Sequence, residues 1–284
     1  METKQHNGPV ECPPPPGAAE HDLDVPPAVV RQFSPQTQEW AVFIFLYNEG
    51  AKLRHQLMRF PPDGKRSFDI LVGDDGSNDD CASDQLMKDY GVTARVALLT
   101  NTGLSANMKA GLHWLLNQTN YRGVVFMNGN NKDDPEAISR FIDRIAAGYD
   151  YVQGSRFLLK SDSVDTPLIR RWAIRFLHAP LFSFAARRLM TDTTNGFRAF
   201  SLRFLRDPRV YIFQSCFQKY ELEQYLAWKA IRLGFATCEI PVRRSYSTGP
   251  KGKLCHRADT KIRAGSGHLL MLKPLIELIL GRYR

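Results

Sequence analysis

FDILVGDDGSND, residues 68–79, is an apolar run that ends in two adjacent carboxylates, Asp74 and Asp75, and a tight turn. An apolar segment of this length that is bounded by Gly and Asp is typical of a buried parallel strand. In open α/β sheets, ligands bind just beyond the carboxyl ends of such strands. We therefore expect the two carboxylates to face a ligand.

The chain around this stretch alternates short apolar runs with segments of helical periodicity. The apolar runs predict strands at residues 41–46, 70–72, 96–99 and 124–127, and the periodic segments predict helices at residues 106–116, 135–147, 169–176 and 220–233. Strands that alternate with helices indicate an α/β fold, with a mostly parallel sheet and helices on both faces.

Polar, turn-forming residues follow three of the predicted strands, at residues 47–50 (YNEG), 73–77 (GDDGS) and 128–131 (NGNN). The carboxyl ends of parallel strands meet at one edge of a sheet. The three polar clusters are therefore expected to lie together at that edge.

The composition allows one large hydrophobic core. At 284 residues, 43% of them hydrophobic, the chain is long enough for a single catalytic domain, which we place at residues 38–265. Residues 1–37 contain a proline run among scattered acids and are expected to form a disordered tail. Residues 266–284 are expected to form an apolar, amphipathic helix that lies in a membrane interface or packs on the domain. It is shorter than the roughly 20 apolar residues that span a bilayer.

The formal net charge of +9 predicts an anionic partner, and nucleotides, phospholipid headgroups and polyprenyl phosphates all qualify. Nucleic acid would rest on net charge alone, so no nucleic-acid partner is expected. The five cysteines, at positions 12, 81, 216, 238 and 255, are odd in number and include no close pair. This spacing favours reduced thiols in a cytoplasmic protein over a disulfide framework or a zinc site.

Six short motifs occur in an order that is more specific than any one of them. They are, along the chain, residues 45–49 (FLYNE), 72–77 (VGDDGS), 101–103 (NTG) with 110–112 (AGL), 128–136 (NGNNKDDPE), 154–156 (GSR) and 191–198 (TDTTNGFR). Together they resemble the inverting GT-A glycosyltransferases of family 2, in particular the polyprenyl-phosphate sugar transferases of the dolichol-phosphate mannose synthase type. The resemblance spans about residues 40 to 265.

The resemblance implies a Rossmann-like GT-A domain, a nucleotide-sugar donor, and an acceptor that is a polyprenyl phosphate or a lipid-linked or soluble saccharide. It also implies peripheral association with the anionic inner face of a membrane. Tyr47 and Glu49 would lie by the base and ribose of the donor, and Asp74 or Asp75 would accept a hydrogen bond from the base or a ribose hydroxyl. The alternative for residues 75–77 is a turn that caps the next helix.

The loop after the fourth predicted strand departs from the family pattern. The family has Asp-x-Asp there, which holds Mg²⁺ or Mn²⁺ against the diphosphate, whereas this chain has Asn128 and Asn130. Amide oxygens can still line the donor site and bind a hard cation, but they supply no charge. Three alternatives stay open: Asn130 with Asp133 or Asp134 forms a weaker metal site, Lys132 replaces the ion, or the protein no longer catalyses.

Basic residues of the second half fit an anionic acceptor or the departing diphosphate. By resemblance, Arg156 would contact phosphate with Arg170 or Arg171, and Arg198 would reach a phosphate or a structural carboxylate. Glu221 falls where relatives carry a late acid. It would act as general base if the acceptor is a hydroxyl, since a polyprenyl phosphate needs none. The alternative for Arg170 and Arg171 is a solvated or membrane-facing side of a basic helix, and the alternative for Glu221 is a surface carboxylate on a helix.

A basic, Gly-containing segment at residues 243–262 is expected to close over the diphosphate as a lid, or else to be a solvated loop or to contact anionic lipid. The resemblance as a whole implies glycosyl transfer with inversion at the anomeric carbon. One alternative is a catalytically weak or inactive nucleotide-sugar-binding scaffold, which the asparagines keep open. A nucleotidyltransferase is disfavoured, because it would have a Gly-rich basic loop where this chain has residues 47–50.

Overall fold

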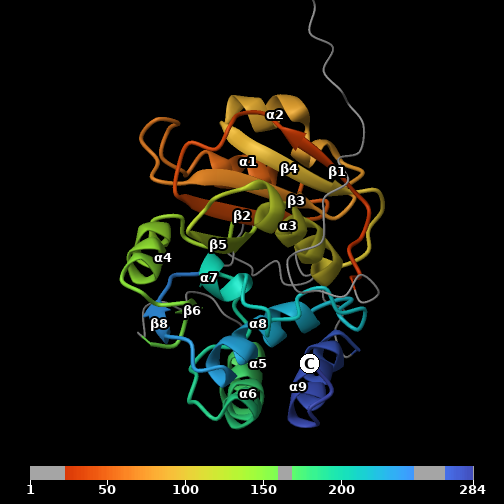
Figure 1. The fold of residues 1–284 in the computed structure, drawn as a ribbon, viewed down its shortest axis with the longest axis vertical. Helices are drawn as coiled ribbons and strands as arrows, with labels where there is room; N and C mark the ends of the chain where they lie inside the picture. Colours follow the sequence, from red (N-terminus) through yellow and green to blue (C-terminus); the bar gives the residue numbers. More distant parts are fainter. Residues whose placement is uncertain (1–22, 159–167, 246–265, 284) are drawn as a thin grey trace, which may run out of the picture.

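The computed structural model describes residues 23–158, 168–245 and 266–283, and Figure 1 shows their arrangement. Within them, one sheet contains eight strands: β1 (Ala28–Gln32), β2 (Trp40–Leu46), β3 (Asp69–Asp74), β4 (Val92–Leu98), β5 (Gly123–Asn128), β6 (Tyr151–Ser155), β7 (Arg198–Ser201) and β8 (Thr237–Pro241). Their order is β1-β4-β3-β2-β5-β7-β6-β8. Strands β2 to β5 run parallel, β6 is parallel to β8, and β1 and β7 are antiparallel to their neighbours. The predicted α/β fold is confirmed.

The helices lie between the strands in the chain, except for α9, which follows β8. They are α1 (Ala51–Leu57), α2 (Asp84–Asp89), α3 (Leu104–Gln118), α4 (Ala137–Ala146), α5 (Leu168–Ala173), α6 (Ala179–Ala186), α7 (Leu202–Leu205), α8 (Glu221–Arg232) and α9 (Ser266–Ile279), with a short turn η2 (Asp80–Ala82) and a π-helical turn η3 (Ile174–His178). Each predicted strand and helix is present, with ends that differ by a few residues. The basic helix predicted at 169–176 is α5 continued by η3.

The central strand β2 is buried on both faces, which explains its uninterrupted apolar sequence. Phe43 and Phe45 pack into one core cluster, together with side chains of α3 and α8. Val42, Ile44 and Leu46 point the other way, into a second cluster with α1 and α4. Because side chains alternate along a strand, one apolar run serves both cores and fixes the sheet between its helical layers.

The predicted disordered tail, residues 1–37, is wrong at its C-terminal end. Residues 1–22 lie outside the described residues, but Ala28–Gln32 form β1, which pairs antiparallel with β4. Thr37 then fastens the chain to β3, because its backbone N–H and its hydroxyl donate to Asp69 at 2.9 and 2.7 Å. Pairing to an edge strand and these hydrogen bonds order a segment whose composition alone indicates disorder.

Helices α5 and α6, joined by η3, form an arm beyond the sheet, and α9 lies beside it (Figure 1). Helix α9 packs on the domain through Leu275 and Leu278, and Tyr283 just after it is also buried, while Ile276 and Leu280 stay exposed. Among the described residues, no helix is both long and apolar enough to cross a bilayer. The predicted lid at 243–262 lies largely outside the described residues.

Candidate active site

The three polar clusters lie at the same edge of the sheet. Parallel pairing places Leu46 opposite Asp74 and Phe45 opposite Asn128, so the loops after β2, β3 and β5 begin side by side. Strand β7 runs the other way, so its first residue, Arg198, pairs with Phe126 near this edge. The chain brings polar loops from both halves of the sequence to one place.

The first two loops are fastened to each other. The backbone N–H of Asn48 donates to the Ser77 hydroxyl, and the Asn48 side-chain oxygen accepts from the N–H of Asn78, both at 2.9 Å. Asn48 takes a left-handed backbone, with φ of 46°. Asp74 is buried, and its Oδ1 accepts from the N–H of Ser77 at 2.9 Å. Tyr47, beside Asn48, therefore lies in a loop of fixed shape.

Asp75 fastens the loop that precedes α3. Its carboxylate accepts from the N–H of Thr102 at 2.9 Å, from the N–H of Gly103 at 3.0 Å, and from the Asn101 amide at 2.8 Å. The side chain is 5% exposed. Asp75 therefore has a structural role, which is additional to any contact that it makes with a ligand. Glu49, in the loop before, lies 3.7 Å from Lys52.

The loop after β5 is held by hydrogen bonds along its whole length. Asn130 Oδ1 accepts from the N–H of Lys132 at 3.3 Å, and the N–H of Asn131 donates to Gln56 Oε1 at 2.9 Å. The Arg59 guanidinium donates to Asn131 Oδ1 at 3.0 Å. Hydrogen bonds to Gln56 of α1 and to Arg59 thus hold the loop that stands at the predicted metal-binding position.

Both carboxylates of this loop are paired with arginines. Asp133 is fully buried and forms an ion pair with Arg244, which also donates to Asn195 Oδ1 at 3.3 Å. Asp134 lies 3.4 Å from Arg59. The predicted metal set of Asn130, Asp133 and Asp134 shares one loop, but its carboxylates face guanidinium groups. Among the described residues, no group of three or more His, Cys, Asp or Glu side chains could hold a metal ion.

Arg156 is enclosed by residues 191–197, a loop that is named the acceptor-side loop for the role that the family resemblance implies. Its Nε and Nη2 donate to the Asp192 carboxylate at 2.7 and 2.9 Å, and Nη2 also donates to the Thr194 hydroxyl at 2.7 Å. The side chains are 1% and 0% exposed. Burial alone would raise the pKa of Asp192, but the guanidinium and the N–H donors more than offset it and hold that pKa below its ordinary value. Arg156 therefore stabilises the conformation of this loop from inside the protein.

Arg198 and Glu221 also hold backbone in place. Arg198 is 2% exposed and donates to the carbonyl of Asn195 at 2.7 Å and to that of Glu223 at 2.9 Å. The Glu221 carboxylate is buried and accepts from the N–H of Gln218 at 3.1 Å, which ties down the turn before α8. These contacts hold backbone in place, and neither of them is the contact with an acceptor hydroxyl that a general base makes.

Glu223 is a site residue that sequence reasoning did not assign. A Cβ placed on Gly196 would lie 3.0 Å from Glu223 Oε1 and 2.8 Å from Asn128 Nδ2, so both side chains converge over that glycine. Its carboxylate also lies 3.9 Å from Arg198 and is partly exposed. The signal in the sequence was its spacing of two residues from Glu221, which is too common to single it out.

The arm beside the acceptor-side loop carries exposed aromatic and aliphatic side chains. Trp172 and Phe176 stack at 4.5 Å and are each 61% exposed, and Phe184 and Leu189 are exposed further along. Arg171 lies on the same arm, and the side chain of Arg170 lies outside the described residues. The arm meets the core at His178, whose ring bonds the Thr193 hydroxyl at 2.7 Å.

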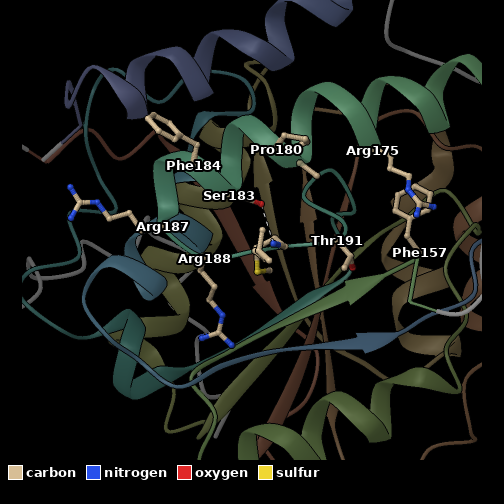
Figure 2. Close-up of a pocket in the computed structure, with 11 residues that line it drawn as sticks. Phe157, Arg175, Pro180, Ser183, Phe184, Arg187, Arg188 and Thr191 are labelled. Carbon is tan, nitrogen blue, oxygen red and sulfur yellow. Dashed lines mark hydrogen bonds between the residues drawn. The ribbon is translucent and has the colours of Figure 1, made fainter.

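A groove of about 530 Å³ opens between the arm and the loop that leads to Thr191. Figure 2 shows Arg175 and Phe157 at one end of it, and Arg187 with Arg188 at the other. The remaining lining is apolar, from Ala179, Pro180, Phe184, Leu189 and Met190, with Ser183 and Thr191. A groove with cationic ends and an apolar floor suits an amphiphile with an anionic head.

Comparisons with known proteins agree with this geometry. Residues 41–213 match the family described as Glycosyl transferase family 2. The chain is 29% identical to the polyprenol monophosphomannose synthase of Mycolicibacterium smegmatis over 80% of this chain and 83% of that protein. It is 32% identical to an undecaprenyl-phosphate 4-deoxy-4-formamido-L-arabinose transferase of Pseudomonas aeruginosa, over 49% of this chain and 40% of that protein.

Solved structures show the same fold. Glucosyl-3-phosphoglycerate synthase from Mycobacterium tuberculosis, in complex with Mn²⁺, UDP and glucosyl-3-phosphoglycerate, superposes with a TM-score of 0.59. The match covers 87% of this chain and 80% of that one, at 15% identity. At that identity the likeness concerns the fold alone.

Proposed function

This chain belongs to glycosyl transferase family 2, and from that premise we propose that it transfers a sugar from a nucleotide-diphosphate sugar to a polyprenyl phosphate. Family membership makes it a glycosyltransferase. The observation that carries the choice of acceptor is the groove with cationic ends that lies between the arm and Thr191. Two of its relatives are named for polyprenol or undecaprenyl phosphate chemistry, which supports the same choice.

The donor would lie across the loops after β2, β3 and β5. Tyr47, Glu49 and Asp74 would contact the base and ribose, because their loops are locked together by Asn48. The diphosphate and sugar would then extend toward residues 128–132, where amide groups and a lysine follow the end of β5. Asp75 supports this arrangement by fixing the loop before α3.

The residues at the family's metal position do not fit a divalent cation of that kind. Such a cation prefers charged oxygen ligands, whereas Asn128 and Asn130 are neutral and the carboxylates of Asp133 and Asp134 are paired with arginines. The proposed reaction therefore involves no metal ion at this position. Charge on the departing diphosphate has to be met by groups of the chain.

The acceptor would approach from the arm. Its isoprenoid chain would lie against the exposed aromatic and aliphatic side chains, and its phosphate would sit near one of the two cationic ends of the groove. Arg171 and the exposed pair Trp172 and Phe176 also suit a surface of anionic lipid, because aromatic rings favour the headgroup level and guanidinium groups attract phosphate. The chain would thus act peripherally at the inner, cytoplasmic face of a membrane.

The chemistry follows from these placements. An oxygen of the acceptor phosphate attacks the anomeric carbon, a new carbon–oxygen bond forms, and the bond to the donor diphosphate breaks with its electron pair on the leaving group. The nucleophile is already an anion, so no base has to remove a proton. Attack opposite to the leaving group inverts the configuration.

A hydroxyl acceptor is the second candidate, and the position of Glu223 favours it. Its carboxylate is partly exposed and converges with Asn128 over Gly196, whereas the Glu221 carboxylate is held by backbone N–H groups. Glu223 would therefore be the general base for a saccharide acceptor. In that case Glu223→Gln would lower turnover about 100-fold or more, because a general base contributes about 10²–10⁴-fold.

The test offers the protein one radiolabelled nucleotide sugar with three acceptors: a polyprenyl phosphate, the matching polyprenol, and a soluble saccharide. We expect label in the organic phase with the polyprenyl phosphate and not with the polyprenol, and unchanged transfer in Glu223→Gln. Transfer to the saccharide that Glu223→Gln abolishes would instead support the hydroxyl acceptor.

A further inference from the structure

We infer that this chain holds the donor diphosphate with its own cationic side chains and binds the donor without a divalent cation. The inference concerns the cationic loop, defined as residues 128–134 with Arg59 and Arg244. It rests on the proposed function, since it supposes a nucleotide-diphosphate donor. It goes beyond that function because it assigns to Lys132 and the two arginines what an ion does at this position in the family.

The amide side chains have lost the charge that attracts a cation. Replacing two carboxylates and a dication by Asn128 and Asn130 leaves the summed charge of these groups unchanged at zero. Asn130 Oδ1 already accepts from the N–H of Lys132 at 3.3 Å. Asn128 Nδ2, a donor, is the atom that lies over Gly196. A donor group suits a phosphate or sugar oxygen and repels a metal ion.

The neighbouring carboxylates do not replace the missing ones. Asp133 is fully buried and paired with Arg244, and the two residues also form a backbone bridge. The N–H of Ser245 donates to the Lys132 carbonyl at 2.9 Å, so the chain after β8 is strapped to the loop. Only Oδ1 of Asp133 bonds to Arg244, and its buried Oδ2 has no hydrogen-bond partner among the described residues. A metal ion at Oδ2 would lie beside the Arg244 guanidinium, whose positive charge repels a cation.

The second carboxylate is equally engaged. Arg59 reaches Asp134 at 3.4 Å while donating to the carbonyl of Asp133 at 3.2 Å and to Asn131 Oδ1 at 3.0 Å. The loop therefore contains three cationic groups against two carboxylates, and both carboxylates have guanidinium partners. The summed charge of the cationic loop is therefore positive, which favours a diphosphate, and the backbone of Lys132 is held by Asn130 and Ser245 before any ligand binds.

The experiment is a calorimetric titration of the full chain with UDP, GDP and their sugars, in EDTA and in Mn²⁺. We expect one nucleotide to bind with dissociation constants that agree within about twofold in the two buffers. Binding that requires Mn²⁺ would overturn the inference and leave the proposed function intact. Absence of binding in both buffers would overturn the inference and the proposed donor together.

A gain-of-metal variant sharpens the test. Asn128→Asp with Asn130→Asp restores the two carboxylates of the family's Asp-x-Asp, so Mn²⁺ should raise its thermal unfolding temperature and broaden the Mn²⁺ paramagnetic resonance signal. The wild type should show neither effect. Asn131→Asp is the matched control, because it adds a carboxylate to the same loop on the side of Arg59, and it should stay insensitive to Mn²⁺. A Mn²⁺ response of the wild type as large as that of the double variant would contradict the inference.

Lys132→Gln tests the cation directly. In EDTA it should weaken binding of the nucleoside diphosphate about 10-fold, equivalent to about 1.4 kcal/mol, and leave binding of the nucleoside unchanged. The same loss for nucleoside and diphosphate would point to a distorted loop. Unchanged diphosphate binding would remove Lys132 from the proposed site.

Discussion

Removing the carboxylate of Asp192 should strongly destabilise the domain, because it removes the buried carboxylate that the Arg156 guanidinium faces. Asp192 and Arg156 are 0% and 1% exposed, and the guanidinium donates to the carboxylate at 2.7 and 2.9 Å. In Asp192→Ala the guanidinium keeps the Thr194 hydroxyl at 2.7 Å but loses its counter-charge. Breaking one side of a buried pair costs about 3–5 kcal/mol.

The assay is urea unfolding followed by far-ultraviolet circular dichroism, with thermal unfolding as a second measure. A loss of about 3–5 kcal/mol corresponds to a fall of roughly 6–20 °C in the unfolding temperature of a chain of this size. The matched control replaces both partners, Arg156→Met with Asp192→Leu. We expect this double variant to lose less than Asp192→Ala, because it leaves no unpaired charge in the core.

The pair also predicts the sign of the pH dependence. Since the folded-state pKa of Asp192 lies below its unfolded value of about 3.9, its contribution is fully present above that value. It is lost as pH falls through the folded pKa. The stability advantage of the wild type over the Arg156→Met and Asp192→Leu variant should therefore hold from pH 8 to 5 and shrink in stronger acid.

One result would refute this reasoning. If Asp192→Ala unfolded within about 1 kcal/mol of the wild type but lost donor or acceptor binding, the pair would belong to the ligand site and Arg156 would contact phosphate, as the family resemblance implies. If Asp192→Ala instead loses stability and binding together, and binding returns at a low temperature where the variant is folded, the role of the pair is structural.

Two further predictions concern the turn at Gly76, after β3, and the arm formed by α5, η3 and α6. Gly76→Ala should cost about 1–3 kcal/mol or more in urea unfolding, because φ is +68° and its new Cβ would lie 2.5 Å from backbone. Gly64→Ala, with φ of +79° but open space around it, should cost less. Trp172→Ser with Phe176→Ser should reduce cosedimentation with phosphatidylserine vesicles several-fold, since both rings are exposed beside arginines. Tyr211→Ser, also exposed, is the control, and an equal reduction there would remove the arm from the membrane proposal.

Much of the sheet could be predicted because its central strands are apolar on both faces. Strand β2 and its neighbour β3 read as short hydrophobic runs that end in turn residues, and their parallel pairing follows from the helices between them. Strand β6 could not be read in this way. Gln153 and Ser155 are buried polar residues that bond to partners distant in the chain, Asn195 and Thr191, so the segment resembles a loop.

The location of the candidate site could be predicted from the sequence, but the pairing of its charged side chains could not. Polar clusters at strand ends indicated the edge where Asp74 and Asn128 meet. The partners of its charged groups were not visible, because Arg156 and Asp192 are 36 residues apart and Asp133 and Arg244 are 111 apart. Pairing over such separations depends on the finished fold, and it decides which carboxylates remain for a ligand.

The most direct test of the account is mass spectrometry of the lipid fraction after the full chain has acted on a nucleotide sugar and a short polyprenyl phosphate. The account predicts a lipid heavier by one sugar residue and an equal amount of released nucleoside diphosphate, in EDTA as in Mn²⁺. A nucleotide sugar that binds but returns unchanged, with the lipid unmodified in both buffers, would contradict it and identify the chain as a binding scaffold.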